Sequence, residues 1–215
     1  MTHHNPFPAD APVHSLEHWL APELARISPP NAPSRLRQLA DAQGTGAAGW
    51  SSAIAGGPVL ALAGMFFAVT SGNPAAALVL VPLGVGLMLS GLFGWKRARA
   101  ALPTPDRVLI SRGPGSARGG VAMMSVLAVA LGAIMVLYLP SATAKGNGAA
   151  ITLVGAFVLI LLLLVACIVV PSTVMGRARQ SFRERVQSNP ELRRAVEEDL
   201  ALWRDPHGNA AYGPL

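Results

Sequence analysis

The stretch "ITLVGAFVLILLLLVACIVV", residues 151–170, decides the fold class of this chain. Fifteen of its residues are Ile, Leu, Val or Phe, and none of its residues carries a charge. A helix of about 20 apolar residues matches the hydrocarbon core of a bilayer, which is roughly 30 Å thick. Each such apolar residue favours insertion by about 0.3 to 0.6 kcal/mol, so the whole segment favours it by roughly 4 to 9 kcal/mol. We therefore predict a transmembrane helix at these residues.

Long runs without charge extend this prediction to most of the chain. Of the 215 residues, 52% are hydrophobic and only 13% are charged. Charged residues are absent from 42–95, 119–144 and 146–176. Such sorting is expected in a bilayer, because an ionised side chain at the membrane centre costs about 2.5 to 3.5 kcal/mol. The predicted fold is an all-α membrane protein with four transmembrane helices, the other three at 50–70, 75–95 and 119–139.

The four helices divide the chain into five parts. They are a proline-rich N-terminal tail with short amphipathic helices (1–48), a first transmembrane hairpin (49–95), a basic loop (96–118), a second transmembrane hairpin (119–171) and a helical C-terminal tail (172–215). In the first tail, Ser34 is placed to cap a second short helix. The loops inside the two hairpins share Gly-Asn and Ala-Ala, in "SGNPAAALVL" and "KGNGAAITLV". A tandem duplication of one hairpin and a coincidence between alanine-rich loops both remain open.

The distribution of basic residues predicts which way the chain faces. Sixteen of the 17 Lys and Arg residues lie in the two tails and the basic loop, and only Lys145 lies in a loop inside a hairpin. By the positive-inside rule the tails, the basic loop and both termini are cytoplasmic. Arginine outnumbers lysine fifteen to two, beside abundant Ala, Gly and Pro, which is typical of a GC-rich bacterial genome. We therefore predict a multi-pass protein of the bacterial cytoplasmic membrane. The net charge of +6 is explained by this orientation, and we predict no nucleic-acid partner.

Five basic residues stand just beyond the ends of the predicted helices. Long basic side chains at this level can reach anionic lipid head groups, and each contributes about 1 kcal/mol near such a surface. The predicted membrane-anchoring residues are Lys96, Arg97, Arg99, Arg177 and Arg179. The alternative for these residues is a specific lipid or protein site.

Small residues recur every four positions in the first two transmembrane segments. They are Ala53, Gly57 and Ala61 in the first segment and Gly86, Ser90 and Gly94 in the second. Such stripes let two helix backbones approach closely, which matters because lipid gives apolar helices little reason to associate. Since only residues 71–74 separate these two segments, we predict that they pair with each other.

The C-terminal tail contains "SNPELRRAVEEDLALWRD", residues 188–205, which has the pattern of an amphipathic helix. Ser188 or Asn189 can cap this helix, and Pro190 suits its first position. Its apolar stripe consists of Leu192, Val196, Leu200 and Trp203. Such a stripe has to cover the chain's own bundle, a second copy or another subunit. We predict that it is a docking surface for a partner.

The segment "PVHSLEHW", residues 13–20, contains the pattern H-x-x-E-H, with which inverted zinc peptidases bind zinc. His14, Glu17 and His18 form this pattern. A hydrolytic zinc site also needs a third ligand and a shaped cavity. The match covers only five residues, and the charge-free run begins soon after it, at residue 42. We interpret the two histidines as surface residues of a short helix, and we predict neither a metal site nor an enzyme.

The predicted transmembrane segments contain no Asp, Glu, Lys, Arg or His. Pumps and solute carriers usually place such residues at membrane depth, so their absence argues against these classes. We predict a non-catalytic integral membrane subunit without a cofactor. It would dock through its cytoplasmic tails on other integral membrane subunits and support the assembly or stability of a larger complex, for example a respiratory or transport complex. The alternative is a small four-helix transporter or channel that moves about Pro82, which removes a backbone donor in mid-membrane.

Overall fold

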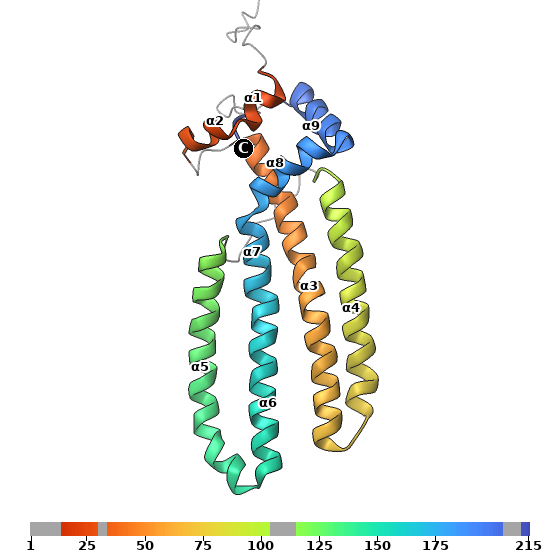
Figure 1. The fold of residues 1–215 in the computed structure, drawn as a ribbon, viewed down its shortest axis with the longest axis vertical. Coiled ribbons are helices and arrows are strands. Elements are labelled where there is room, and N and C mark those ends of the chain that lie inside the picture. Colours follow the sequence, from red (N-terminus) through yellow and green to blue (C-terminus); the bar gives the residue numbers. More distant parts are fainter. Residues whose placement is uncertain (1–13, 30–33, 104–114, 204–211) are drawn as a thin grey trace, which may run out of the picture.

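A computed structural model describes residues 14–29, 34–103, 115–203 and 212–215, and the described chain is built from helices (Figure 1). Parts of the predicted N-terminal tail and basic loop, 1–13 and 104–114, lie outside the described residues. The elements are α1 (Leu16–Leu20), α2 (Pro22–Ile27), α3 (Arg35–Ser71), α4 (Ala75–Ala100), α5 (Ala117–Ala144), α6 (Asn147–Leu164), the π-helix η1 (Val165–Val169), α7 (Val170–Gly176), α8 (Ala178–Ser188) and α9 (Pro190–Leu202). The predicted all-α class is therefore confirmed for the described residues.

Four helical stretches are long and apolar enough to cross a membrane, which agrees with the four predicted segments. They are α3, α4, α5 and the run from α6 through η1 to α7. This last run passes through Pro171 without a break. Directly before the proline, the Val170 N–H donates to the Val165 carbonyl, five residues back. The wider π-helical turn gives room to a proline ring that would clash with the preceding turn of a regular helix.

The first long helix, α3, begins at Arg35, well before the transmembrane segment predicted at 50–70. Ser34 caps it, and its hydroxyl accepts a hydrogen bond from the Arg37 N–H at 3.1 Å. The separate short helix expected after Ser34 is therefore the first part of α3. The segment between the cap and the membrane contains no proline, so nothing in it ends the helix.

Helices α3 and α4 lie side by side over their apolar lengths (Figure 1). Gly72 ends α3 in the left-handed conformation, at φ 68°, and leads the chain into α4. Where the two helices meet, a Cβ on Gly57 would lie 2.5 Å from the Gly84 carbonyl oxygen. Ala61, also in the predicted stripe of α3, has its backbone nitrogen 2.8 Å from a Cβ on Gly84. The two backbones therefore touch at positions that have room only for glycine.

The contact face of α4 differs from the stripe expected at Gly86, Ser90 and Gly94. Gly84 and Gly91 are the buried glycines of α4, and both lie against α3. Nothing lies within 4 Å of a Cβ on Gly86, and Ser90 is exposed, whereas Gly94 does face α3. A spacing of seven residues is close to two helical turns and keeps Gly84 and Gly91 on one face. The predicted stripe at Gly86, Ser90 and Gly94 therefore lies mostly on a face of α4 next to the one that contacts α3.

Helix α5 packs beside the run from α6 to α7, and this run contacts α3 (Figure 1). Where α5 meets α7, a Cβ on Gly120 would lie 2.6 Å from the Ser172 Cβ. Where α6 meets α3, the ring of Phe66 lies over Gly155. As a result α3 and α6 lie in the middle of the arrangement, with α4 and α5 on its outer flanks (Figure 1).

The two ends of the described chain fold together at one end of the long helices (Figure 1). We call this part the head, and it comprises α1, α2, the first turns of α3, α8, α9 and residues 212–215. Its buried hydrophobic residues are Leu16, Leu20, Leu36, Leu39, Ala40, Phe182, Val186, Leu192, Val196, Tyr212 and Leu215. Segments about 180 residues apart in the sequence therefore share one hydrophobic core.

The apolar stripe of α9 is covered by the chain itself. Leu192 is 2% exposed and Val196 is 0% exposed, and Leu200 and Trp203 pack against the same core. Asn189 caps α9, accepting from the Leu192 N–H at 3.3 Å, and the chain turns there. The docking surface expected on this stripe is corrected to an internal one, because the turn folds α9 back onto the core of the head.

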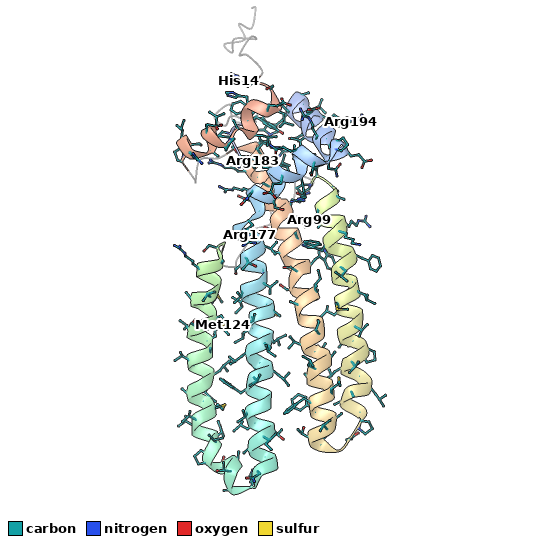
Figure 2. All side chains as sticks on the ribbon, in the orientation of Figure 1. His14, Arg99, Met124, Arg177, Arg183 and Arg194 are labelled. Carbon is teal, nitrogen blue, oxygen red and sulfur yellow. The ribbon has the colours of Figure 1, made fainter. Side chains whose placement is uncertain are left out.

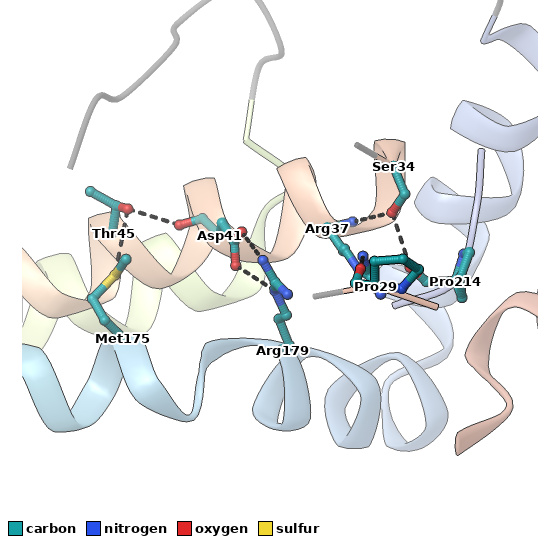
Figure 3. Close-up of polar contacts among 8 residues, drawn as sticks. All are labelled: Pro29, Ser34, Arg37, Asp41, Thr45, Met175, Arg179 and Pro214. Atoms are coloured by element: carbon teal, nitrogen blue, oxygen red, sulfur yellow. Dashed lines mark hydrogen bonds and ion pairs between the residues drawn. The ribbon is translucent and has the colours of Figure 1, made fainter. Parts of the chain in front are cut away.

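Polar contacts also tie the C-terminal residues to the start of α3. The Ser34 hydroxyl donates to the Pro214 carbonyl at 3.0 Å (Figure 3). Arg35, whose side chain is only 9% exposed, donates from Nε and Nη2 to the two carboxylate oxygens of Asp199 at 3.1 and 2.7 Å. This two-pronged geometry is the strong form of an arginine–carboxylate contact.

Candidate functional site at the junction of the head and the membrane helices

A pocket of about 600 Å³ lies where the head meets the long helices, between α3, α4, α7 and α8. Figure 2 shows Arg99 and Arg177 at this level, just beyond the apolar parts of their helices. The side chains on its wall that can donate or accept hydrogen bonds are Trp95, Arg99, Arg177, Gln180, Ser181, Glu184 and Arg185. The pocket is therefore apolar on the side of α3 and strongly basic on the sides of α4 and α8.

Helix α8 reaches this position because it crosses α3 very closely at Gly44. A Cβ on Gly44 would collide with the Cβ of Ala178, at the start of α8. On α8, Ser181 and Arg185 are four residues apart and so share one face of the helix. The close crossing brings this face to the end of α4, where Arg99 is located.

Two guanidinium groups are held next to each other in the pocket. Arg99 donates from Nη2 to the Ser181 hydroxyl at 2.9 Å, and its Cζ lies 4.3 Å from the centroid of the Trp95 ring. Arg185 donates from Nη1 to the Arg99 carbonyl and from Nε to the Ser181 carbonyl, both at 3.0 Å. All these acceptors are neutral, so they fix the two side chains without cancelling their charge.

The pocket has an excess of positive charge. Burial, and then the charge of Arg99, lower the pKa of Arg185 to about 10. The carboxylate on the pocket wall, Glu184, is exposed and accepts from Gln180 Nε2 at 3.0 Å. With Arg177, the wall carries three guanidinium groups and one carboxylate, a net formal charge of +2. Such a cavity attracts anions, because its low-dielectric walls strengthen the field of its charges.

The five predicted anchoring residues divide into two groups. Lys96, Arg97 and Arg177 have exposed side chains at the ends of their helices, where they remain able to reach head groups. Arg99 and Arg179 are half-buried and contact other parts of the chain. The sequence placed all five at the membrane surface, but it gave no indication that two of them also join helices.

Arg179 connects α8 to α3 through Asp41 (Figure 3). It donates from Nε and Nη2 to the two carboxylate oxygens at 3.0 and 2.8 Å, and this hydrogen bonding raises the pKa of Arg179. Beside it, the Thr45 hydroxyl donates to the Asp41 carbonyl at 2.8 Å and lies 3.5 Å from the Met175 sulfur. Together, the contacts of Asp41 with Arg179 and of Thr45 with Met175 hold α8 and α7 against α3.

His14 and the helix α1, which carries Glu17 and His18, lie on the side of the head away from the long helices (Figures 1 and 2). The rings of His14 and His18 stack with centroids 4.2 Å apart. Glu17 pairs with Arg193 of α9. Within the described ranges there is no cluster of three or more His, Cys, Asp or Glu residues placed to hold a metal ion.

Sequence reasoning missed Arg185 and Trp95 as members of a site. A signal for the first was present, because Arg177, Ser181 and Arg185 are spaced by four residues and share a helix face. Trp95 was treated only as the end of a transmembrane segment. Its contact with Arg99, four residues on in the same helix, is a local one, but the sequence does not reveal that α8 packs beside them to form a pocket.

No protein-family model, no curated protein and no solved structure matches this chain.

Proposed function

We propose that this chain is a non-catalytic integral membrane subunit that supports the assembly or stability of a larger membrane protein complex. In this proposal it lies in a bacterial cytoplasmic membrane, with the head and both termini in the cytoplasm. Its partners are other integral membrane subunits and the anionic lipids around them. The head replaces the extended tails as the cytoplasmic docking element, because much of the two tails is folded into it.

The observation that carries this proposal is the small share of the long helices that the chain buries itself. In the most apolar 18-residue window of each, 17% of α3, 11% of α4, 6% of α5 and 6% of the α6–α7 run are buried. Exposed large side chains include Val129, Leu137 and Val158. Helices in lipid associate through close packing, so these open faces are suited to contact with further transmembrane helices.

The transport alternative has less support. Pro82 lies inside an unbroken α4, and its side chain is exposed. This favours a proline tolerated on the outer flank of α4 over a moving part. The pocket at the junction lies beside the head and not in the apolar middle of the helices, where a substrate pathway would have to pass.

Purification from the native membrane tests the subunit proposal. A tagged chain expressed at its natural level and extracted in mild detergent is expected to elute with one or more other membrane proteins in fixed stoichiometry. Deleting the chain is expected to lower the amount of those proteins in the membrane, and re-expression is expected to restore it. Size-exclusion chromatography and quantitative mass spectrometry measure both effects.

Two results would count against this proposal. A chain that elutes as a monomer or homodimer under the mildest extraction has no stable partner. Co-eluting proteins whose levels do not change on deletion do not depend on this chain.

A tagged variant with Val129 and Leu137 both replaced by tryptophan tests whether α5 is the contact face. The added bulk on the exposed face of α5 is expected to reduce co-elution without affecting the head.

Site-directed labelling tests the orientation. In a Cys167→Ala background, Asn73→Cys lies in the exposed turn between α3 and α4, and Gln187→Cys lies on the exposed surface of α8. A membrane-impermeant maleimide added to intact cells is expected to label Asn73→Cys and not Gln187→Cys, because sixteen basic residues favour the cytoplasmic side for the segments around the head. Permeabilised cells are expected to label both, and the reverse pattern in intact cells would invert the topology.

A further inference from the structure

Two arginines of the pocket at the junction differ in their partners from three arginines that form ion pairs. Arg35, Arg179 and Arg193 each pair with a carboxylate. Arg99 and Arg185 lie against each other, half-buried, and among the described residues no carboxylate is within ion-pair distance of either. Placing two like charges together in a partly desolvated site is unfavourable unless an anion compensates them.

A second group in the same pocket also lacks a partner. The Trp95 Nε1–H is buried, and no acceptor in the described part of the chain lies within hydrogen-bonding distance of it. Buried donors are normally satisfied, so this N–H, on a residue of the pocket wall, is a second polar group there that the described chain leaves without a partner. An anion with several oxygens can accept from both guanidinium groups and from a nearby N–H at the same time.

The geometry is set before any ligand arrives. Ser181 holds Arg99 through its hydroxyl and Arg185 through its carbonyl, and Arg185 also donates to the Arg99 carbonyl. Planar guanidinium groups fixed in this way match the oxygens of a phosphate, whereas a lysine would offer only a point charge. The volume of about 600 Å³ is sufficient for a phosphate with an attached glycerol or sugar.

The height of the pocket matches the head-group region of a bilayer. Trp95 ends the charge-free run that includes α4, and Arg177 follows the one that includes α6 and α7. Tryptophan is enriched where the hydrocarbon meets the head groups. Phosphate groups are therefore available at this level both from lipids and from soluble phosphate esters.

We propose that this pocket binds a phosphate-bearing anion through Arg99, Arg185 and Arg177. The anion fits between the end of α4 and α8 and so joins the head to the membrane helices. Exposed Glu184, at the same wall, leaves a net charge suited to one phosphate group. The site goes beyond the anchoring role expected of single basic residues, because it is a defined cavity. It also includes Arg185, which is not one of the five predicted anchoring residues. It does not depend on the proposed subunit function.

The test compares Arg185→Gln with Arg97→Gln in the purified full-length chain. Both variants lose one positive charge near the membrane surface, but Arg97 is exposed and is not on the pocket wall. Binding of phosphatidylglycerol is measured by native mass spectrometry and by the rise in melting temperature, with phosphatidylcholine as the zwitterionic control. Because a charge-assisted, forked contact is lost, Arg185→Gln is expected to weaken binding about tenfold or more, and Arg97→Gln less than about twofold.

A parallel arm distinguishes the two sources of phosphate. Glycerol 1-phosphate and inorganic phosphate are added to the chain in neutral detergent without lipid. Stabilisation by these anions alone identifies a soluble ligand, and stabilisation by phosphatidylglycerol alone identifies a lipid head group. Either result supports the site, provided that Arg185→Gln removes the effect and Arg97→Gln keeps it.

Two results would overturn the proposal. One is that neither the lipid nor the soluble phosphates raise the melting temperature of the wild-type chain above the effect of phosphatidylcholine. The other is that Arg97→Gln and Arg185→Gln lose binding equally, which would indicate general attraction to a basic surface. If Arg185→Gln does not fold, Arg185→Lys replaces it and is expected to keep the charge but lose most of the binding, since it lacks the fork. The wild-type melting measurements do not depend on any variant.

Discussion

Replacing Phe182 by alanine is expected to destabilise the head by about 3 to 5 kcal/mol, the cost of deleting a large aromatic side chain from a closed core. Phe182 is 0% exposed and belongs to the cluster formed by both ends of the chain. Residues from α1, α3, α8 and α9 all contribute to this cluster, so a cavity in it weakens packing between several segments. Loss of this one side chain therefore weakens all the helices of the head together.

Hydrogen exchange in detergent micelles measures the effect of Phe182→Ala. Amides of α8 and α9 are expected to exchange much faster, while those in the middle of α4 and α6 change little. Leu202→Ala is the matched control, because Leu202 is also in the head but 81% exposed, and its removal is expected to cost less than about 0.5 kcal/mol. Equal protection in the two variants would show that the buried cluster does not hold the head together.

The second large effect is expected from Gly84→Ala, where α4 packs against α3. The added Cβ would lie 2.8 Å from the Ala61 backbone nitrogen and would collide with the Gly57 carbonyl oxygen. Backbone atoms cannot rotate away as the end of a side chain can, so the two helices have to separate. Overpacking of this kind costs about 1 to 3 kcal/mol, and here it acts on the most extensive helix contact of the described chain.

Gly86→Ala provides a close control for Gly84→Ala. It makes the same chemical change two residues along the same helix, at a position with nothing within 4 Å of the new Cβ. Replacing glycine by alanine in a helix is favourable by itself by up to about 1 kcal/mol, so Gly86→Ala is expected to be neutral or stabilising. Unfolding in mixed micelles with increasing SDS measures both, and the same midpoint for the two variants would place the α3–α4 contact on another face.

The two substitutions probe different forces in one molecule. The head is held by burial of apolar area away from water, to which Phe182 is a major contributor. The long helices are apolar enough to cross a membrane, and in lipid their association would depend on close backbone contact at glycines. The α3–α8 crossing at Gly44 joins the two regions, and the basic pocket lies beside it.

The number and approximate position of the helices that are long and apolar enough to cross a membrane were predictable from the sequence. Hydropathy is a property of local composition, so the segment at 151–170 is recognised as a long apolar helix without knowledge of the segments that pack against it. The cap at Asn189 and the helix that follows it were also predictable, because capping acts over three or four residues. The cap at Ser34 was predicted for the same reason, but the length of the helix that it begins was not, since a cap marks where a helix begins and not where it ends.

What the sequence by itself determined is therefore the class of the protein: four apolar helices, with nearly all the cations in the two tails of the chain and in the loop between the hairpins. Only the tertiary structure decided that Leu192 and Val196 pack inside the chain, that Gly84 and not Gly86 faces α3, and that Arg99 and Arg185 meet in one pocket. The physical reason is the range of the interactions. Insertion and capping depend on residues close together in the sequence, whereas a core, a helix contact and a pocket arise from segments that only the fold brings together.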